Sequence, residues 1–184
     1  MTDLERLHEI IKEKSITFGD FVLASGQRSS YYIDARKTTM SAEGLRLIGQ
    51  VGLGLIRRQH WMADAVGGLT MGADPVAYAI ARASWDGGPV LDAFSVRKAA
   101  KEHGTKRQIE GNLSPGHRVV VVEDVITSGA SALQAIAAVR EAGGIVVGVL
   151  AVVDREQGGR RAIAADGLEV VVITTTSELG IQPG

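Results

Sequence analysis

The chain has 184 residues, a formal net charge of −1, 45% hydrophobic and 22% charged residues, and no cysteine. This length suits one domain with a sizeable core, and the composition is that of a globular protein. The near-zero charge gives no reason to expect a nucleic-acid or acidic-membrane partner, and the missing cysteines exclude a disulfide framework and cysteine-ligated metal. The charged, amphipathic N-terminus differs from a signal peptide, and no stretch is apolar enough to span a bilayer, so we expect a cytoplasmic location.

Hydrophobic patterns predict helices and strands that alternate along the chain. Strands are expected at 21–23, 31–33, 63–66, 90–96, 119–122, 145–153 and 170–173. Helices are expected at 3–14, 41–59 with Ser41 as N-cap, 74–83 capped by Asp74-Pro75, from about 133 to Gly143-Gly144, and 160–165. This alternation predicts an α/β fold with a mostly parallel sheet, helices on both faces, and ligands beyond the carboxyl ends of the strands.

A cation-rich stretch, Arg97-Lys98-Ala99-Ala100-Lys101-Glu102-His103-Gly104, opens a polar segment that runs to Gly116. The segment is longer than most connections in compact domains and lacks apolar periodicity, which indicates a functional loop. Arginine can donate bidentate hydrogen bonds to two oxygens of a phosphate, and lysine acts as a point charge, so this cluster of cations suits a diphosphate. A solvated basic loop would have the same composition, and the residues alone leave both interpretations open.

Residues Val119 to Ser131 combine an apolar run, an acidic pair and a small, hydroxyl-rich loop ahead of a helix. The run to Val122 predicts a strand buried on both faces, followed by Glu123 and Asp124. Backbone N–H groups at a helix start, with small and hydroxyl side chains around them, suit a phosphate. The carboxylates suit sugar hydroxyls or Mg²⁺ instead. A sugar phosphate could bind to the loop through its phosphate and to the acidic pair through its hydroxyls. The alternative is an ordinary strand–helix turn with a solvated acidic pair.

This stretch closely resembles the phosphoribosyl-diphosphate (PRPP) motif of type I phosphoribosyltransferases. In that family the acidic pair holds the ribose hydroxyls and the loop binds the 5-phosphate. The resemblance implies PRPP binding by Glu123, Asp124, Val125, Ile126, Thr127, Ser128, Gly129, Ala130 and Ser131.

The basic segment resembles the mobile catalytic loop of orotate phosphoribosyltransferases, with its R-K-x-x-K-x-H-G pattern. The resemblance implies that Arg97, Lys98, Lys101 and His103 also bind PRPP. Lys101 and His103 become candidates for neutralising or protonating the departing oxygen, and they form the expected catalytic set together with Asp124.

A third stretch, Asp154 to Gly159, matches the D-R-x-x-G-G signature of the same family, in which the arginine binds the orotate carboxylate. An anionic base needs a cationic partner, although a surface turn with a local ion pair would look similar. An aromatic pair near the N-terminus matches residues that lie against the pyrimidine, with core or subunit packing as the alternative. The orotate-binding residues that the resemblance implies are Thr127, Arg155, Tyr31 and Tyr32.

The sequence departs from the family pattern at two cationic positions. Ala24 stands near the place where many relatives carry a lysine that reaches PRPP. Thr70-Met71 stands within Gly67–Pro75, the counterpart of the diphosphate loop, where many relatives have Tyr-Lys. We expect backbone amides and the Thr70 hydroxyl to bind the diphosphate instead.

The resemblance implies conversion of orotate and PRPP to orotidine 5′-monophosphate and diphosphate, in de novo pyrimidine synthesis, with Mg²⁺ carried by PRPP rather than by a dedicated protein site. It implies the type I phosphoribosyltransferase fold as one domain, with a small hood from about residues 1–40. It also implies a homodimer that shares loop 97–112, in which Arg97, Lys101 and His103 reach across and Lys98 serves its own subunit. The alternatives are a purine-base phosphoribosyltransferase and a non-catalytic PRPP-sensing regulator.

Overall fold

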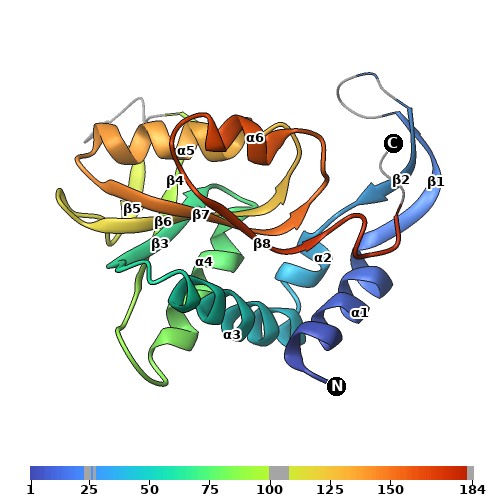
Figure 1. Cartoon of the computed structure of the whole chain (residues 1–184), viewed down its shortest axis with the longest axis horizontal. Helices are drawn as coiled ribbons and strands as arrows, with labels where there is room; N and C mark the ends of the chain where they lie inside the picture. The colour runs from blue at the N-terminus through green and yellow to red at the C-terminus, as the bar shows by residue number, and fades with distance from the viewer. Residues whose placement is uncertain (23–25, 27, 100–107, 182–184) are drawn as a thin grey trace.

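The computed structural model describes residues 1–22, 26, 28–99 and 108–181. Its centre is a six-stranded sheet with the strand order β5-β4-β3-β6-β7-β8 (Figure 1). Its strands are β3 (Ala65–Leu69), β4 (Asp92–Val96), β5 (Ile109–Gly111), β6 (Arg118–Ile126), β7 (Ile145–Asp154) and β8 (Val170–Thr175). All neighbouring strands are parallel except β5, which pairs antiparallel with β4.

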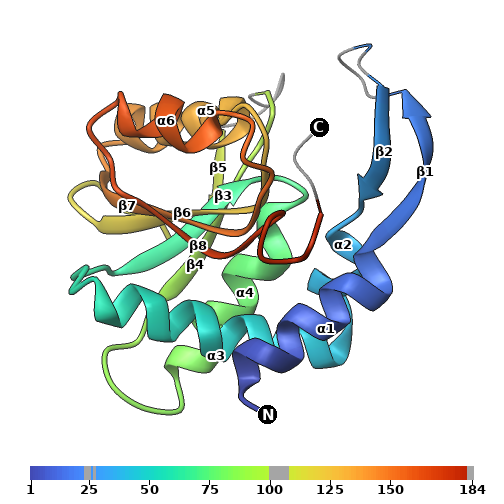
Figure 2. The same cartoon turned by 45° about the vertical axis from the view of Figure 1, so that its right-hand side comes forward.

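Helices cover both faces of this sheet, which confirms the predicted α/β architecture (Figures 1 and 2). One face carries α5 (Ala130–Glu141) and α6 (Gly159–Ala164). The other carries α3 (Ala42–Arg58) and α4 (Ala73–Ser84), with α1 (Asp3–Ser15) beside α3. Within the described residues, no helix combines the length and the apolar character that crossing a bilayer requires.

The central strand β6 supplies side chains to both layers because successive strand residues face opposite sides. Val119 and Val121 belong to the apolar cluster beneath α5, whereas Val120 and Val122 belong to the cluster beneath α3 and α4. All four valines are fully buried, as the sequence predicts for a strand covered on both faces.

The N-terminal segment forms a separate hairpin beside the sheet (Figure 2). Strands β1 (Ile16–Val22) and β2 (Arg28–Ile33) pair antiparallel, and the short helix α2 (Arg36–Thr39) connects them to α3. Helix α1 begins with a capping box in which Thr2 and Glu5 satisfy each other's backbone N–H groups.

Several predicted boundaries are wrong, for identifiable reasons. Strand β6 continues through the acidic pair to Ile126 because its pairing with β7 extends to Asp154, beyond the point where pairing with β3 stops. The segment after Val96 contains strand β5 rather than loop alone. Gly72, not Asp74, is the N-cap of α4, and it makes no side-chain capping bond. Helix α5 starts at Ala130, three residues before its apolar pattern, and α2 was not predicted.

Candidate active site

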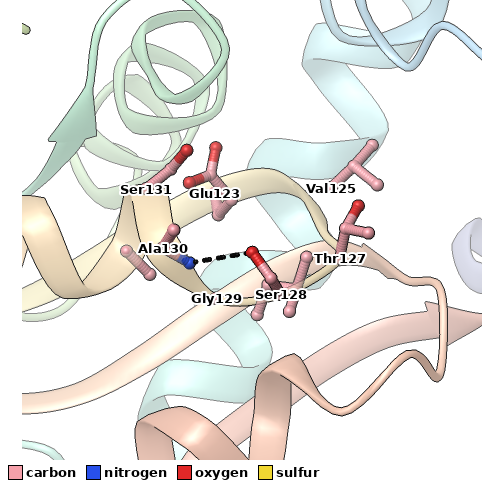
Figure 3. Close-up of a pocket in the computed structure, with 9 residues that line it drawn as sticks. Glu123, Val125, Thr127, Ser128, Gly129, Ala130 and Ser131 are labelled. Atoms are coloured by element: carbon pink, nitrogen blue, oxygen red, sulfur yellow. Dashed lines mark hydrogen bonds between the residues drawn. The ribbon is translucent and has the colours of Figure 1, made fainter. Parts of the chain in front are cut away.

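The loop between β6 and α5 forms a pocket at the carboxyl edge of the sheet (Figure 3). The pocket encloses about 80 Å³, and nine residues line it: Glu123, Val125, Ile126, Thr127, Ser128, Gly129, Ala130, Ser131 and Ala132. Eight of these belong to the PRPP motif identified in the sequence, so the structure brings almost the whole motif around one hollow.

Gly129 determines the shape of this loop. It is the N-cap of α5 with φ +84°, a left-handed conformation that favours glycine. A Cβ atom there would also lie 2.9 Å from the carbonyl oxygen of Gly159, the first residue of α6. The exposed Thr127, Ser128 and Ser131 present hydroxyls around the start of α5, where backbone N–H groups suit an anion. Ser128 Oγ accepts from the Ala130 backbone N–H at 3.4 Å.

Glu123 lies at the base of the pocket and is only 5% exposed. Its Oε2 atom is buried and has no hydrogen-bond partner among the described residues. Burial, together with the negative charge and side-chain contact of Asp124, raises the pKa of Glu123 to about 9. In the ligand-free site Glu123 is therefore protonated at neutral pH, and its unpartnered oxygen is available to a ligand hydroxyl.

Asp124, the next residue of β6, meets the loop between β3 and α4 rather than lining the pocket. A Cβ atom on Gly72 would lie 2.5 Å from Asp124 Oδ1, so only glycine allows this approach. Asp124 Oδ1 also accepts from the Val125 backbone N–H at 2.9 Å. The two acidic residues therefore contact different loops. Glu123 lines the pocket between β6 and α5, and Asp124 faces Gly72, in the segment that corresponds to the diphosphate loop.

Arg155 follows β7 at the same edge and is 7% exposed. Its guanidinium carbon lies 5.1 Å from the centre of the Tyr31 ring, so strand β2 of the hairpin covers it. The buried atoms Arg155 Nε and Nη2 and the Tyr31 hydroxyl have no hydrogen-bond partner among the described residues. A buried guanidinium with free donors is costly unless an anion pairs with it, which indicates a binding position for a carboxylate.

The two tyrosines predicted to act as a pair have different surroundings. Tyr31 is 1% exposed and lies under Arg155, whereas Tyr32 is 42% exposed and its ring centre lies 5.8 Å from that of Phe21. Successive residues of one strand face opposite sides, so only Tyr31 shares the Arg155 environment here.

The described residues at the base of the cation-rich loop contact other parts of the same chain. Arg97 donates to Glu110 Oε1 at 3.0 Å, and the Lys98 carbonyl accepts from the Gln134 side chain at 2.9 Å. An exposed pair such as Arg97–Glu110 contributes at most about 1 kcal/mol, so a ligand can displace it. Lys101, His103 and Ala24 lie outside the described residues, and their predicted roles stay predictions.

Asp74 lies within the predicted diphosphate-loop segment 67–75, and it contacts Ser95, which the sequence did not single out. Asp74 accepts from the Thr70 hydroxyl at 2.5 Å and from the Ser95 hydroxyl at 2.6 Å, which ties the loop after β3 to the end of β4. The Thr70 hydroxyl donates to Asp74 in the ligand-free structure, and its expected contact with a diphosphate stays a prediction. The available signal was positional: Ser95 is the next-to-last residue of a strand whose carboxyl end lies at the same sheet edge.

One edge of the sheet thus offers a pocket suited to a phosphate, an acidic pair on β6 for hydroxyl groups, and a buried cation for a carboxylate. Among the described residues, no group of three or more His, Cys, Asp or Glu side chains could hold a metal ion alone. The arrangement can hold a sugar phosphate and an anionic second ligand next to each other.

Comparisons with known proteins agree with this geometry. The phosphoribosyl transferase domain model matches residues 53–177. The orotate phosphoribosyltransferase of Aquifex aeolicus is 48% identical over 182 residues, which cover 97% of this chain and 98% of that protein. Two crystal structures of the orotate phosphoribosyltransferase of Mycobacterium tuberculosis H37Rv are also similar. The complex with Fe(III) dicitrate has a TM-score of 0.88 at 44% identity, and the PRPP complex has 0.84 at 41%; each match covers 98% of this chain and 100% of the other. The chain therefore belongs to the orotate phosphoribosyltransferase family, within the type I phosphoribosyltransferase fold.

Proposed function

We propose that this chain transfers the 5-phosphoribosyl group of PRPP to orotate, giving orotidine 5′-monophosphate and diphosphate. The observation that carries the proposal is the buried, unpartnered guanidinium of Arg155 at the sheet edge that also holds the PRPP motif. The motif accounts for the sugar phosphate, and the guanidinium accounts for a base that carries a carboxylate. A purine base has no carboxylate to pair with Arg155, which favours orotate over the purine-base alternative.

The roles of the individual residues follow from their surroundings. The loop Thr127–Ser131 binds the 5-phosphate through backbone N–H groups and hydroxyls at the start of α5. Glu123 and Asp124 hold the ribose hydroxyls from adjacent positions on β6. Arg155 orients orotate by its carboxylate, with Tyr31 beneath the guanidinium. We propose Thr127 and Tyr32 as further orotate contacts on the family resemblance alone.

Bond cleavage at ribose C1 builds positive charge on the sugar and negative charge on the departing diphosphate. Cations near the leaving group therefore lower the barrier, a role that we assign to Arg97, Lys98, Lys101 and His103. The Asp124 carboxylate lies on the ribose side, where the developing charge is positive, and the neutral Glu123 offers its buried oxygen to a ribose hydroxyl. Closure of the cation-rich loop would exclude water from the activated ribose.

We propose Mg²⁺ as the cofactor. Asp124, and Glu123 once it has lost its proton, supply carboxylate oxygens of the kind that Mg²⁺ accepts, but two carboxylates do not fill an octahedral shell. Mg²⁺ would then take most of its ligands from PRPP and water, and when bound it neutralises diphosphate charge.

Three further features are proposed on the family resemblance. The chain forms a homodimer in which loop 97–112 contributes to the neighbouring site. Residues 1–40 act as a hood over the substrate, which the Tyr31–Arg155 contact supports. The reaction takes place in the cytoplasm, for which the cysteine-free sequence is suited.

The test is diphosphate release by the purified chain with PRPP and Mg²⁺, in the presence of orotate, uracil or hypoxanthine. We expect release with orotate at a rate far above that with either other base. Preference for hypoxanthine would support the purine-base alternative, and PRPP binding without turnover of any base would support the regulator.

A further inference from the structure

Glu156 immediately follows Arg155 and connects its loop to the segment after β8. A single carboxylate oxygen, Glu156 Oε2, accepts three hydrogen bonds: from the Thr176 hydroxyl at 2.8 Å, the Ser177 backbone N–H at 2.7 Å, and the Ser177 hydroxyl at 2.6 Å. The bonds from Ser177 and Thr176 hold the pKa of Glu156 below its ordinary value. The side chain is therefore an ionised anchor at neutral pH, although the residue itself is exposed.

The backbone of Glu156 indicates that this anchor has a conformational cost. Glu156 has φ +58°, a left-handed conformation that is uncommon for residues other than glycine, asparagine and aspartate. Such a conformation persists only where surrounding interactions hold it. Here those interactions are the three bonds to Oε2 and a fourth from the Glu156 backbone N–H to Asp154 Oδ1 at 2.8 Å.

The anchored turn determines where the Arg155 side chain goes. The Arg155 backbone N–H donates to the Ile126 carbonyl at 2.9 Å, which fixes the residue on its β6 side. Glu156 fixes the next residue on the β8 side, so Arg155 lies between two attachments. Its guanidinium is thereby held against Tyr31 with Nε and Nη2 unpartnered, in the arrangement that a carboxylate ligand needs.

We propose that Glu156 is a positioning residue for base recognition: by anchoring the turn to Thr176 and Ser177, it holds Arg155 ready for the carboxylate of the base. This inference rests on the proposed function, because it assigns Arg155 to the orotate carboxylate. It adds that the affinity for that carboxylate depends on a residue that does not touch the substrate.

The experiment compares two nucleotides that differ only in the carboxylate: the product orotidine 5′-monophosphate and its analogue uridine 5′-monophosphate. Their dissociation constants are measured by calorimetry for wild type, Glu156→Gly, Glu156→Ala, Glu156→Gln and Arg155→Ala. Glycine tolerates the positive φ, so Glu156→Gly removes the anchor without adding backbone strain. Glu178→Ala is the matched control, since Glu178 is an exposed glutamate in the same C-terminal segment whose carboxylate accepts from Thr175 instead.

We expect Glu156→Gly to reduce the preference for orotidine monophosphate by about tenfold, consistent with loss of one well-oriented charged contact. Glu156→Ala should reduce it at least as much, Glu156→Gln should restore part of it, and Glu178→Ala should leave it unchanged. Thermal melts of all variants identify any loss of folding. If Glu156 had a purely structural role, its replacement would weaken the binding of both nucleotides equally. The ratio of the two dissociation constants would then stay as in wild type, and this result would overturn the inference.

A double-mutant cycle separates this inference from the proposed function. If Glu156 acts through Arg155, Glu156→Gly should not change the ratio further in an Arg155→Ala background. An additional loss there would contradict action through Arg155. If Arg155→Ala leaves the wild-type ratio unchanged, the orotate assignment of Arg155 fails, and this inference fails with it. If Arg155→Ala abolishes the preference and Glu156→Gly does not alter it, only the role of Glu156 is wrong.

Discussion

Replacing Glu123 by glutamine should stabilise the ligand-free protein while it damages function. Glu123 is 5% exposed, and burial followed by the charge of Asp124 raises its pKa from an ordinary 4.5 to about 9. The unfolded chain releases the Glu123 proton near pH 4.5, whereas the folded chain keeps it until near pH 9. The contribution of this carboxyl to stability is therefore fully present below pH 4.5 and is lost progressively as the pH rises to about 9.

The size of this loss of stability follows from the difference between the pKa values of Glu123 in the unfolded and folded chain. Each pH unit between the two pKa values costs about 1.4 kcal/mol, so the loss at pH 7 is at most about 3.5 kcal/mol. Glutamine has nearly the same shape and no proton to release. We expect Glu123→Gln to match wild type near pH 4.5 and to exceed its free energy of unfolding by about 1–3 kcal/mol at pH 7.

Urea unfolding of both proteins at a series of pH values between about 4.5 and 9, without PRPP and at equal protein concentration, measures this difference. Glu169→Gln, at an exposed position, is the control and should follow wild type. The same Glu123→Gln protein should bind PRPP more weakly. Parallel stability curves for Glu123→Gln and wild type across the whole range would refute the conclusion that Glu123 is buried in its neutral form.

Three further substitutions test the remaining assignments. Asp124→Asn should reduce turnover and PRPP affinity while the protein stays folded, because a charged hydrogen bond to the ribose contributes about 1.5–3 kcal/mol; an unchanged PRPP dissociation constant would contradict this role. Arg155→Ala should weaken orotate binding with much less effect on PRPP, and separate titrations of the two ligands would reveal an equal loss if the assignment is wrong. Mixing inactive Lys101→Ala with inactive Asp124→Asn should restore about a quarter of wild-type activity if subunits pair randomly and the loop serves the neighbouring site. Proven subunit exchange without recovery would place Lys101 in its own subunit's site.

The local sequence pattern determined most of the architecture. Apolar runs and helical periodicity predicted each strand of the parallel sheet and every helix except α2. They could do so because the faces of an element that are buried determine the spacing of its apolar residues. The PRPP motif was equally local: its loop, glycine and hydroxyls are consecutive in the chain, and they line one pocket. The missed boundaries, such as the extension of β6 through Glu123 and Asp124, depend on pairing with β7, which residue order alone does not reveal.

What only the tertiary structure decided is the environment of each charged group. The sequence contains Glu123, Arg155 and Tyr31 far apart, and their polarity gives no sign of burial. The fold excludes water from all three and leaves polar atoms of each without a partner among the described residues. The contact of Asp74 with Ser95, and those of Glu156 with Thr176 and Ser177, likewise join segments that follow different strands. Residue types thus determined which chemistry is available. The packing of distant strands against one another decided which groups are desolvated and free to bind, because desolvation depends on every atom around a group.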